Sequence, residues 1–135
     1  LTVPVIAVIT GEGNSGGALA LGVANRVLML ENAVYAILSP EGFASILWKD
    51  AQRREEACGL MKLTAPDLLG LGVIDEIIRE PEGGAHLAPR VALGEVDRCL
   101  SRHLAELLRQ SGAALAEARY QKFRRMGADI QREDP

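Results

Sequence analysis

The chain has 135 residues and a formal net charge of −3, from 15 basic and 18 acidic side chains. Hydrophobic residues make up 48% of it and aromatic residues 4%, so we expect one globular domain with a core of aliphatic side chains. The near balance of charge gives no basis for binding nucleic acid or an anionic membrane. No apolar run approaches the roughly 20 residues of a membrane span.

The cysteines and the first residues indicate the context of the chain. Cys58 and Cys99 stand in neither a CxxC nor a Cys/His metal spacing, so we expect two reduced thiols, a cytoplasmic protein and no metal site. The chain begins at Leu1, without a methionine or a basic leader. We therefore expect a piece of a longer protein and no signal peptide.

The first 38 residues predict strands interrupted by one glycine-rich turn and one helix. The unbroken apolar run before the turn favours a strand covered on both faces, and the alanine-rich run after it favours a buried helix. In chain order, we predict a strand at Val5–Thr10, a turn at Gly11–Gly17, a helix at Ala18–Ala24, and strands at Arg26–Leu30 and Val34–Leu38.

The remaining residues predict mainly helices. Ser39, Pro40 and Glu41 have the order of a helix cap, a first helical residue and a first-turn acid. Apolar residues at helical spacing mark one long helix after residue 90. In chain order, we predict a helix at Ala44–Met61, a helix from the Thr64–Asp67 cap to Leu71, a strand at Val73–Ile78, a loop at Glu80–Pro89, helices at Val91–Gln110 and Ala113–Met126, and a polar, frayed tail from Asp129.

The glycine-rich turn allows more than one function. Gly11, Gly13 and Gly16 satisfy G-x-G-x-x-G between a predicted strand and a predicted helix, and Glu31 follows 20 residues after Gly11. This spacing is that of a dinucleotide-binding unit, so a dinucleotide-dependent oxidoreductase is one hypothesis. A purely structural turn, which only lets the helix pack on the strand, is another.

The backbone of this turn can also serve a reaction. Amides in the first turn of a helix have no intrahelical partner, and the helix dipole lies behind them. Gly16 and Gly17 can therefore present two donors to a phosphate, or to an oxygen that gains negative charge. Because glycine has no side chain, such an oxygen has room to approach the backbone.

Four motifs in order decide between these hypotheses. They are Gly-Glu-Gly-Asn-Ser-Gly-Gly-Ala-Leu-Ala at 11–20, Ser-Pro-Glu-Gly at 39–42, Gly-Val-Ile-Asp-Glu-Ile-Ile at 72–78 and Glu-Pro-Glu-Gly-Gly-Ala-His at 80–86. This order resembles the carboxyltransferase alpha subunit of acetyl-CoA carboxylase, a family of the crotonase superfamily. The resemblance is close over residues 4–89 and looser at 119–122. Asn14 stands where the family usually has glycine, and Phe43 where a small residue or cysteine is common.

The resemblance implies that the chain contains part of an α/β, crotonase-like ββα superhelix, followed by C-terminal helices. Residues 1–89 would be the C-terminal part of the carboxyltransferase core, 90–128 a helical extension and 129–135 a polar tail. The family transfers the carboxyl group of carboxybiotin, held on the biotin carboxyl carrier protein, to acetyl-CoA, giving malonyl-CoA for fatty acid synthesis. It acts with a beta subunit, in an α2β2-type assembly.

The resemblance also implies site residues. The amides of Gly16 and Gly17 would form an oxyanion hole for the ureido oxygen of biotin, while Gly13, Asn14 and Ser15 would bind substrate. A crotonase-like scaffold subunit without catalytic activity remains an alternative.

The remaining polar side chains predict no second site. Ser15, Ser39 and Ser45 lack an evident His/Asp partnership, which argues against a hydrolase triad. We expect His86 to bond to the backbone of its loop and His103 to lie at the surface or an interface. Glu41 is expected to cap its helix, and the charged run at 53–56 to be a solvated helix face.

Overall fold

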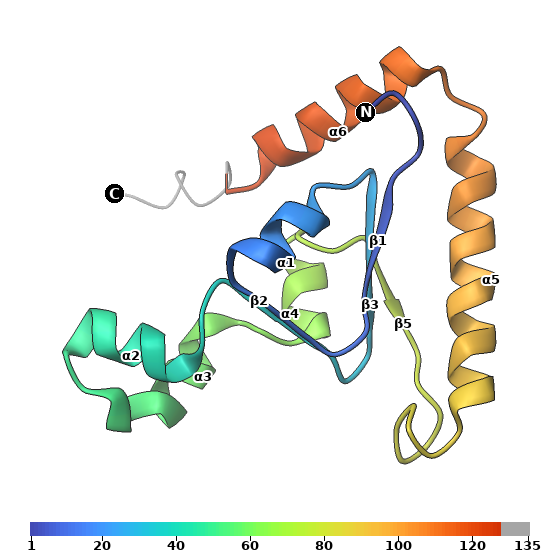
Figure 1. Cartoon of the computed structure of the whole chain (residues 1–135). Coiled ribbons are helices and arrows are strands. Elements are labelled where there is room, and N and C mark those ends of the chain that lie inside the picture. The colour runs from blue at the N-terminus through green and yellow to red at the C-terminus, as the bar shows by residue number, and fades with distance from the viewer. Residues whose placement is uncertain (128–135) are drawn as a thin grey trace.

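A computed structural model describes residues 1–127 (Figure 1). The predicted tail from Asp129 lies outside these described residues. The strands are β1 (Ile6–Ile9), β2 (Glu12–Asn14), β3 (Arg26–Leu30), β4 (Val34–Ala36) and β5 (Glu76–Ile78). The helices are α1 (Ser15–Gly22), α2 (Pro40–Trp48), α3 (Arg54–Met61), α4 (Ala65–Gly70), α5 (Pro89–Leu107) and α6 (Gly112–Arg125), with a 3-10 turn, η1 (Ala51–Arg53).

The strands form two parallel sheets. One has the order β1-β3-β5, and the other pairs β2 with β4. Twice in succession the chain runs strand, strand, helix, first as β1-β2-α1 and then as β3-β4-α2. The first strand of each unit enters the three-stranded sheet and the second enters the two-stranded sheet. This repeated ββα order is the arrangement that the family resemblance implied.

The core lies around the central strand β3. Val27, Leu28 and Met29 are almost fully buried, and Ile78 of β5 packs with them. The long helix α5 lies along this sheet (Figure 1) and contributes Cys99 to the same cluster. Burying each large aliphatic side chain stabilises the fold by about 1.5–3 kcal/mol, so a core with few aromatic residues is sufficient.

Helix α6 is attached to the sheet through a buried asparagine. The Asn25 side chain is 4% exposed and precedes β3. Its Oδ1 accepts hydrogen bonds from the Val5 amide at 3.1 Å and from Arg119 at 2.8 Å, and its Nδ2 donates to the Leu115 carbonyl at 2.8 Å. One side chain thereby joins the start of the chain to a helix near its end.

A second polar cluster joins α5 to β5. The Arg102 guanidinium donates to both oxygens of Glu76, at 2.6 and 2.7 Å, and His103 Nε2 lies 2.6 Å from the same carboxylate. Burial acts to raise the pKa of Glu76, but the hydrogen bonds from His103 and Arg102 outweigh it and lower the pKa. His103 is only 7% exposed, so its predicted place at the surface or an interface is wrong. Its side chain is buried because Glu76 binds it.

The helix predicted at 44–61 is broken into two. Lys49 ends α2 in the left-handed region, with φ of 58°, and the Asp50 carboxylate accepts a hydrogen bond from the Gln52 amide at 2.9 Å. The resulting α2–α3 hairpin projects from the body of the molecule (Figure 1). Arg53 stacks over the Trp48 ring at 4.0 Å, and the charged residues that follow it are exposed, as predicted.

Three predictions about the first unit are also wrong. The predicted turn at 11–17 contains the strand β2, and the helix after it begins at Ser15 and ends at Gly22. This helix is not buried, because only Gly22 is inaccessible. Strand β1, which was predicted to be covered on both faces, is half-buried along its length. Each helix within residues 1–127 is too short or too polar to span a bilayer.

Candidate active site

The site begins where β2 passes directly into α1. Asn14 is the N-cap residue and is extended, and Ser15, Gly16 and Gly17 form the first turn. An N-cap side chain usually accepts a hydrogen bond from the amide of the second or third helical residue, which here are Gly16 and Gly17. The Asn14 side chain makes no such bond. Both glycine amides therefore remain available to a ligand.

Gly16 and Gly17 are both exposed, with open space at their side-chain positions. A Cβ atom added to Gly16 or to Gly17 would meet no atom within 4 Å. The first turn of α1 carries no acidic side chain, so nothing in it offsets the positive end of the helix dipole. The helix start therefore suits an oxygen atom that carries negative charge.

Ser15 adopts a strained conformation at this junction. Its φ is +65°, in the left-handed region that costs an L-residue roughly 1–2 kcal/mol. This residue turns the extended chain of β2 into a helix without an intervening loop. Strain of this kind is retained where the surrounding structure and function require it.

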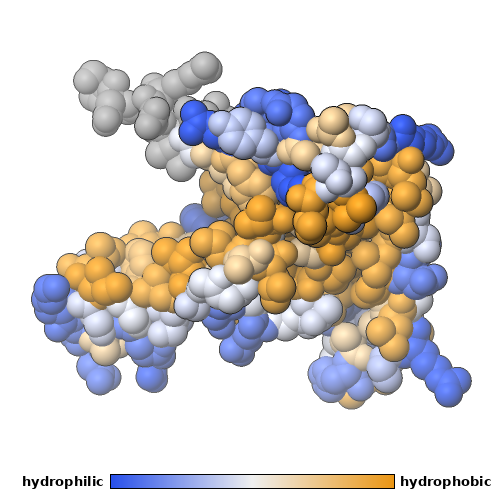
Figure 2. All heavy atoms as spheres, turned by 45° about the horizontal axis from the view of Figure 1, so that its top comes forward, coloured by the Kyte–Doolittle hydropathy of each residue, from blue (hydrophilic) through white to orange (hydrophobic). Residues whose placement is uncertain are grey.

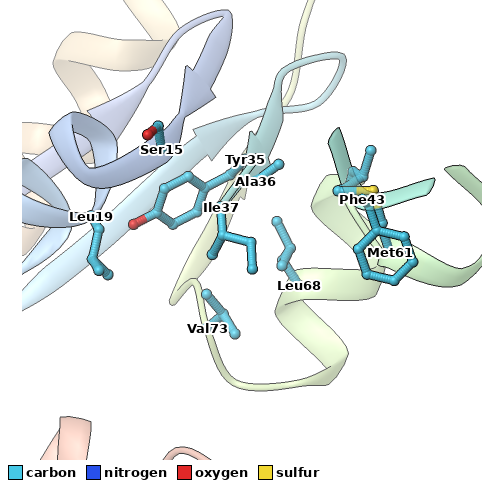
Figure 3. Close-up of a pocket in the computed structure, with 10 residues that line it drawn as sticks. Ser15, Leu19, Tyr35, Ala36, Ile37, Phe43, Met61, Leu68 and Val73 are labelled. Atoms are coloured by element: carbon cyan, nitrogen blue, oxygen red, sulfur yellow. The ribbon is translucent and has the colours of Figure 1, made fainter. Parts of the chain in front are cut away.

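An apolar pocket of about 280 Å³ lies beside the helix start (Figure 3). Its size is near the lower end of the range of about 300–1,000 Å³ for small-molecule sites, so it fits a small apolar group. Phe43 takes part in its wall, edge-on to Trp48 with ring centroids 6.2 Å apart. The pocket is lined by Ser15, Leu19, Tyr35, Ala36, Ile37, Phe43, Met61, Leu63, Leu68 and Val73.

Gly13 has a packing role at this site. It pairs with Tyr35 in the β2–β4 register. A Cβ atom on Gly13 would lie 3.3 Å from Cδ2 of Tyr35 and 3.4 Å from Cγ2 of Ile9. Glycine is therefore favoured here because two side chains close around it. The predicted contacts of Gly13, Asn14 and Ser15 with substrate stay predictions.

Ser39 and Ser45 make hydrogen bonds within α2 and its cap. Ser39 Oγ accepts from the Gly42 amide at 3.2 Å, and Ser45 Oγ donates to the Glu41 carbonyl at 2.8 Å. Glu41 lies in the first turn of α2, but Ser39 provides the side-chain cap. His86 is exposed, and its ring lies against Gly84, where an added Cβ would meet Nδ1 at 3.1 Å.

The loop that holds His86 is organised by a carboxylate. Glu80 accepts from the Asn32 amide at 2.7 Å and the Ala85 amide at 3.0 Å. Burial acts to raise the pKa of Glu80, but these backbone hydrogen bonds outweigh it and lower the pKa. The bonds fix the glycine-rich loop after β5 against the end of β3.

The dinucleotide hypothesis does not fit this geometry. A dinucleotide-binding turn joins a strand directly to a helix, whereas here β2 lies between β1 and α1. Glu31, the candidate ribose ligand, accepts from the Glu80 amide at 3.3 Å and lies 3.8 Å from Arg79. The oxidoreductase interpretation is therefore wrong.

The repeated ββα units define a crotonase-like fold, in which a glycine-rich helix start follows the second strand of the first unit. A solved enoyl-CoA hydratase from Bacillus halodurans has the same fold, with a TM-score of 0.50 and 18% identity over 93% of this chain and 49% of that one. A family model described as acetyl co-enzyme A carboxylase carboxyltransferase-like matches residues 1–127. The chain belongs to this family, as the motif order predicted.

Individual relatives agree with the family match. The acetyl-coenzyme A carboxylase carboxyl transferase subunit alpha of Geobacillus thermodenitrificans is 56% identical over 127 residues, which are 94% of this chain and 39% of that protein. The subunit of the same name from Prochlorococcus marinus strain MIT 9313 is 57% identical over 128 residues, with the same two coverages. The chain spans about two-fifths of the length of these relatives.

Proposed function

We propose that this chain is part of the carboxyltransferase of acetyl-CoA carboxylase. In this proposal it acts in the transfer of a carboxyl group from carboxybiotin, held on the biotin carboxyl carrier protein, to acetyl-CoA, with malonyl-CoA as the product. Membership of the family supports the proposal. The observation that carries it is the pair of uncapped, open amides at Gly16 and Gly17.

The amide pair supplies electrostatic stabilisation. When bound, carboxybiotin supplies the activated carboxyl group. The Gly16 and Gly17 amides donate hydrogen bonds to the ureido oxygen, which gains negative charge as the carboxyl group leaves. Fixed donors of this kind stabilise such charge by about 3 kcal/mol each, because they need no reorganisation during the reaction.

The apolar pocket and the residues beside the amides would hold the substrate. The pocket places apolar side chains beside the helix start, and the lower dielectric of an apolar site, once a partner covers it, strengthens hydrogen bonds to a charged oxygen. The Ser15 hydroxyl lies at this pocket. Asn14 has no capping bond, so both side chains are available to contact the biotin ring. A side-chain nucleophile is not required.

The surroundings of the site fit a protein partner. Leu19 is 56% exposed and Ile37 is 70% exposed, and both line the pocket. Figure 2 shows that hydrophobic side chains continue across this face of the molecule. We propose that a carboxyltransferase beta subunit covers the site and holds acetyl-CoA, in an α2β2-type cytoplasmic assembly that the biotin carboxyl carrier protein visits.

Replacement of Gly17 tests the proposal in the carboxyltransferase assembled with its beta subunit. Gly17→Val adds a branched side chain beside the amides, and its Cβ atom meets no atom of the chain within 4 Å. We expect it to retain the beta subunit and to lose malonyl-CoA formation. The control is Gly94→Val in α5, which is equally open and exposed, and which should stay active. Full activity of Gly17→Val would leave only the scaffold role.

A further inference from the structure

Helix α1 is poorly able to hold its own start in place. It has eight residues, of which Gly16, Gly17 and Gly22 are glycines, and it lacks a side-chain cap. Helices shorter than about 12–15 residues are marginal in water, and each interior glycine costs about 1 kcal/mol relative to alanine. Ser15 adds strain. Contacts from elsewhere in the fold must therefore position this helix.

Tyr35 of β4 makes these contacts. Its hydroxyl donates to the Ala18 carbonyl, in the middle of α1, at 3.4 Å. Figure 3 shows its ring reaching from β4 toward α1, with Ser15 and Leu19 nearby. Burial raises the pKa of the phenol, so it remains a neutral donor in the physiological range.

Two glycines leave room for this one ring. Gly13, just before the helix, would place an added Cβ 3.3 Å from the ring edge. Gly22, the last residue of the helix, would place an added Cβ only 2.4 Å from the Tyr35 hydroxyl and 3.4 Å from Cζ. The ring is therefore in close contact with the chain at both ends of α1.

We propose that Tyr35 is a positioning residue. It fixes the position of α1 and therefore the direction in which the Gly16 and Gly17 amides point. The same ring forms a wall of the pocket. The inference rests on the proposed function for its effect on catalysis, but its effect on α1 is independent of that function. Tyr35 acts through the helix and touches no reacting atom.

A compensating pair of substitutions tests this role in the assembled carboxyltransferase. Gly22→Ala brings a methyl group to 2.4 Å from the hydroxyl, which displaces the ring or the helix. We expect kcat to fall at least ten-fold and KM for acetyl-CoA to change less than two-fold, because the loss lies in transition-state stabilisation. Gly22→Ala with Tyr35→Phe should regain kcat to within three-fold of wild type. The hydroxyl is then absent and Cζ, at 3.4 Å, is in ordinary contact.

Two single variants and a control complete the series. Tyr35→Phe alone should lower kcat less than three-fold, since it loses only a long hydrogen bond. Tyr35→Leu keeps the wall apolar but removes the ring, and should lower kcat at least ten-fold whether or not Gly22→Ala folds. Gly59→Ala in α3, where an added Cβ meets no atom within 4 Å, should behave as wild type.

Hydrogen exchange over residues 12–22 supplies a readout that needs no activity. Exchange should be faster in Gly22→Ala and Tyr35→Leu and should return to the wild-type rate in the double variant. Unchanged exchange and kcat in both Gly22→Ala and Tyr35→Leu would overturn the inference. A double variant with no higher kcat than Gly22→Ala would overturn it as well. A wild-type enzyme that forms no malonyl-CoA would overturn the proposed function instead, and the exchange pattern would still decide the role of Tyr35.

Discussion

Gly16→Ala should raise the stability of the protein and lower its activity, so this one variant separates the two properties. The added methyl group meets no atom of the chain within 4 Å, so it creates no clash. Replacing a helical glycine with alanine reduces the entropy of the unfolded chain and stabilises a protein by about 0.4–1 kcal/mol. The thermal unfolding midpoint of the assembled enzyme should therefore equal or exceed that of wild type.

Carboxyl transfer should fall in the same variant. In the proposed site, the methyl group crowds the approach of the ureido oxygen to the amide. The loss of one oxyanion donor costs about 2.7–4 kcal/mol, which corresponds to a 10²–10³-fold fall in kcat. Because the hydrogen bond strengthens as charge develops, the fall should appear in kcat more than in KM.

The assay is a steady-state measurement of malonyl-CoA formation, paired with thermal unfolding of the same preparation. Gly94→Ala is the matched control, since Gly94 is an open, exposed glycine within α5. It should gain similar stability and keep wild-type kcat. The reasoning would be refuted if Gly16→Ala kept wild-type kcat, or if Gly94→Ala lost as much activity.

Three further predictions concern the scaffold and the pocket. Glu76→Gln removes the charge that binds Arg102 and the buried His103, and should lower the free energy of unfolding by about 1–3 kcal/mol in urea titration. The pKa of Glu76 is lower in the folded protein than its ordinary value of 4.5. The stability that the ionised carboxylate contributes is therefore complete above pH 4.5 and is lost as the pH falls through the folded pKa. Because Glu76→Gln lacks this carboxylate, the variant should lose less stability than wild type in that acid range. Asn25→Ala removes one buried and two part-buried hydrogen bonds and should cost at least about 2 kcal/mol by the same titration. Phe43→Ala widens the pocket and should raise KM for the biotinylated carrier roughly five-fold, equivalent to about 1 kcal/mol of lost contact, with a smaller change in kcat.

The sequence predicted the order of elements wherever local chemistry decides it. Ser39 and Pro40 mark the start of α2 as predicted, and the apolar run 26–30 is the central strand β3. The break at Lys49 was missed because that residue takes a left-handed conformation more typical of glycine. The signal that could have revealed it is Asp50, a favourable N-cap residue next to Lys49.

The glycine-rich helix start was predictable from the sequence, but the contacts that support it were not. Gly16 and Gly17 stand out because adjacent glycines at a helix start have a known physical use. The contact of Tyr35 with Gly22 depends on the pairing of β2 with β4, which no local pattern indicates. His103 was misplaced for the same reason, since its partner Glu76 lies 27 residues earlier in the chain.

The most direct test observes the two amides themselves. In the carboxyltransferase labelled with ¹⁵N-glycine, titration with biotin methyl ester should move the amide proton signals of Gly16 and Gly17 downfield, as expected for hydrogen bonds to the ureido oxygen. The 2-imino analogue, which has no oxygen at that position, should leave both signals in place. Signals that do not respond to biotin, or that respond equally to the analogue, would contradict the account.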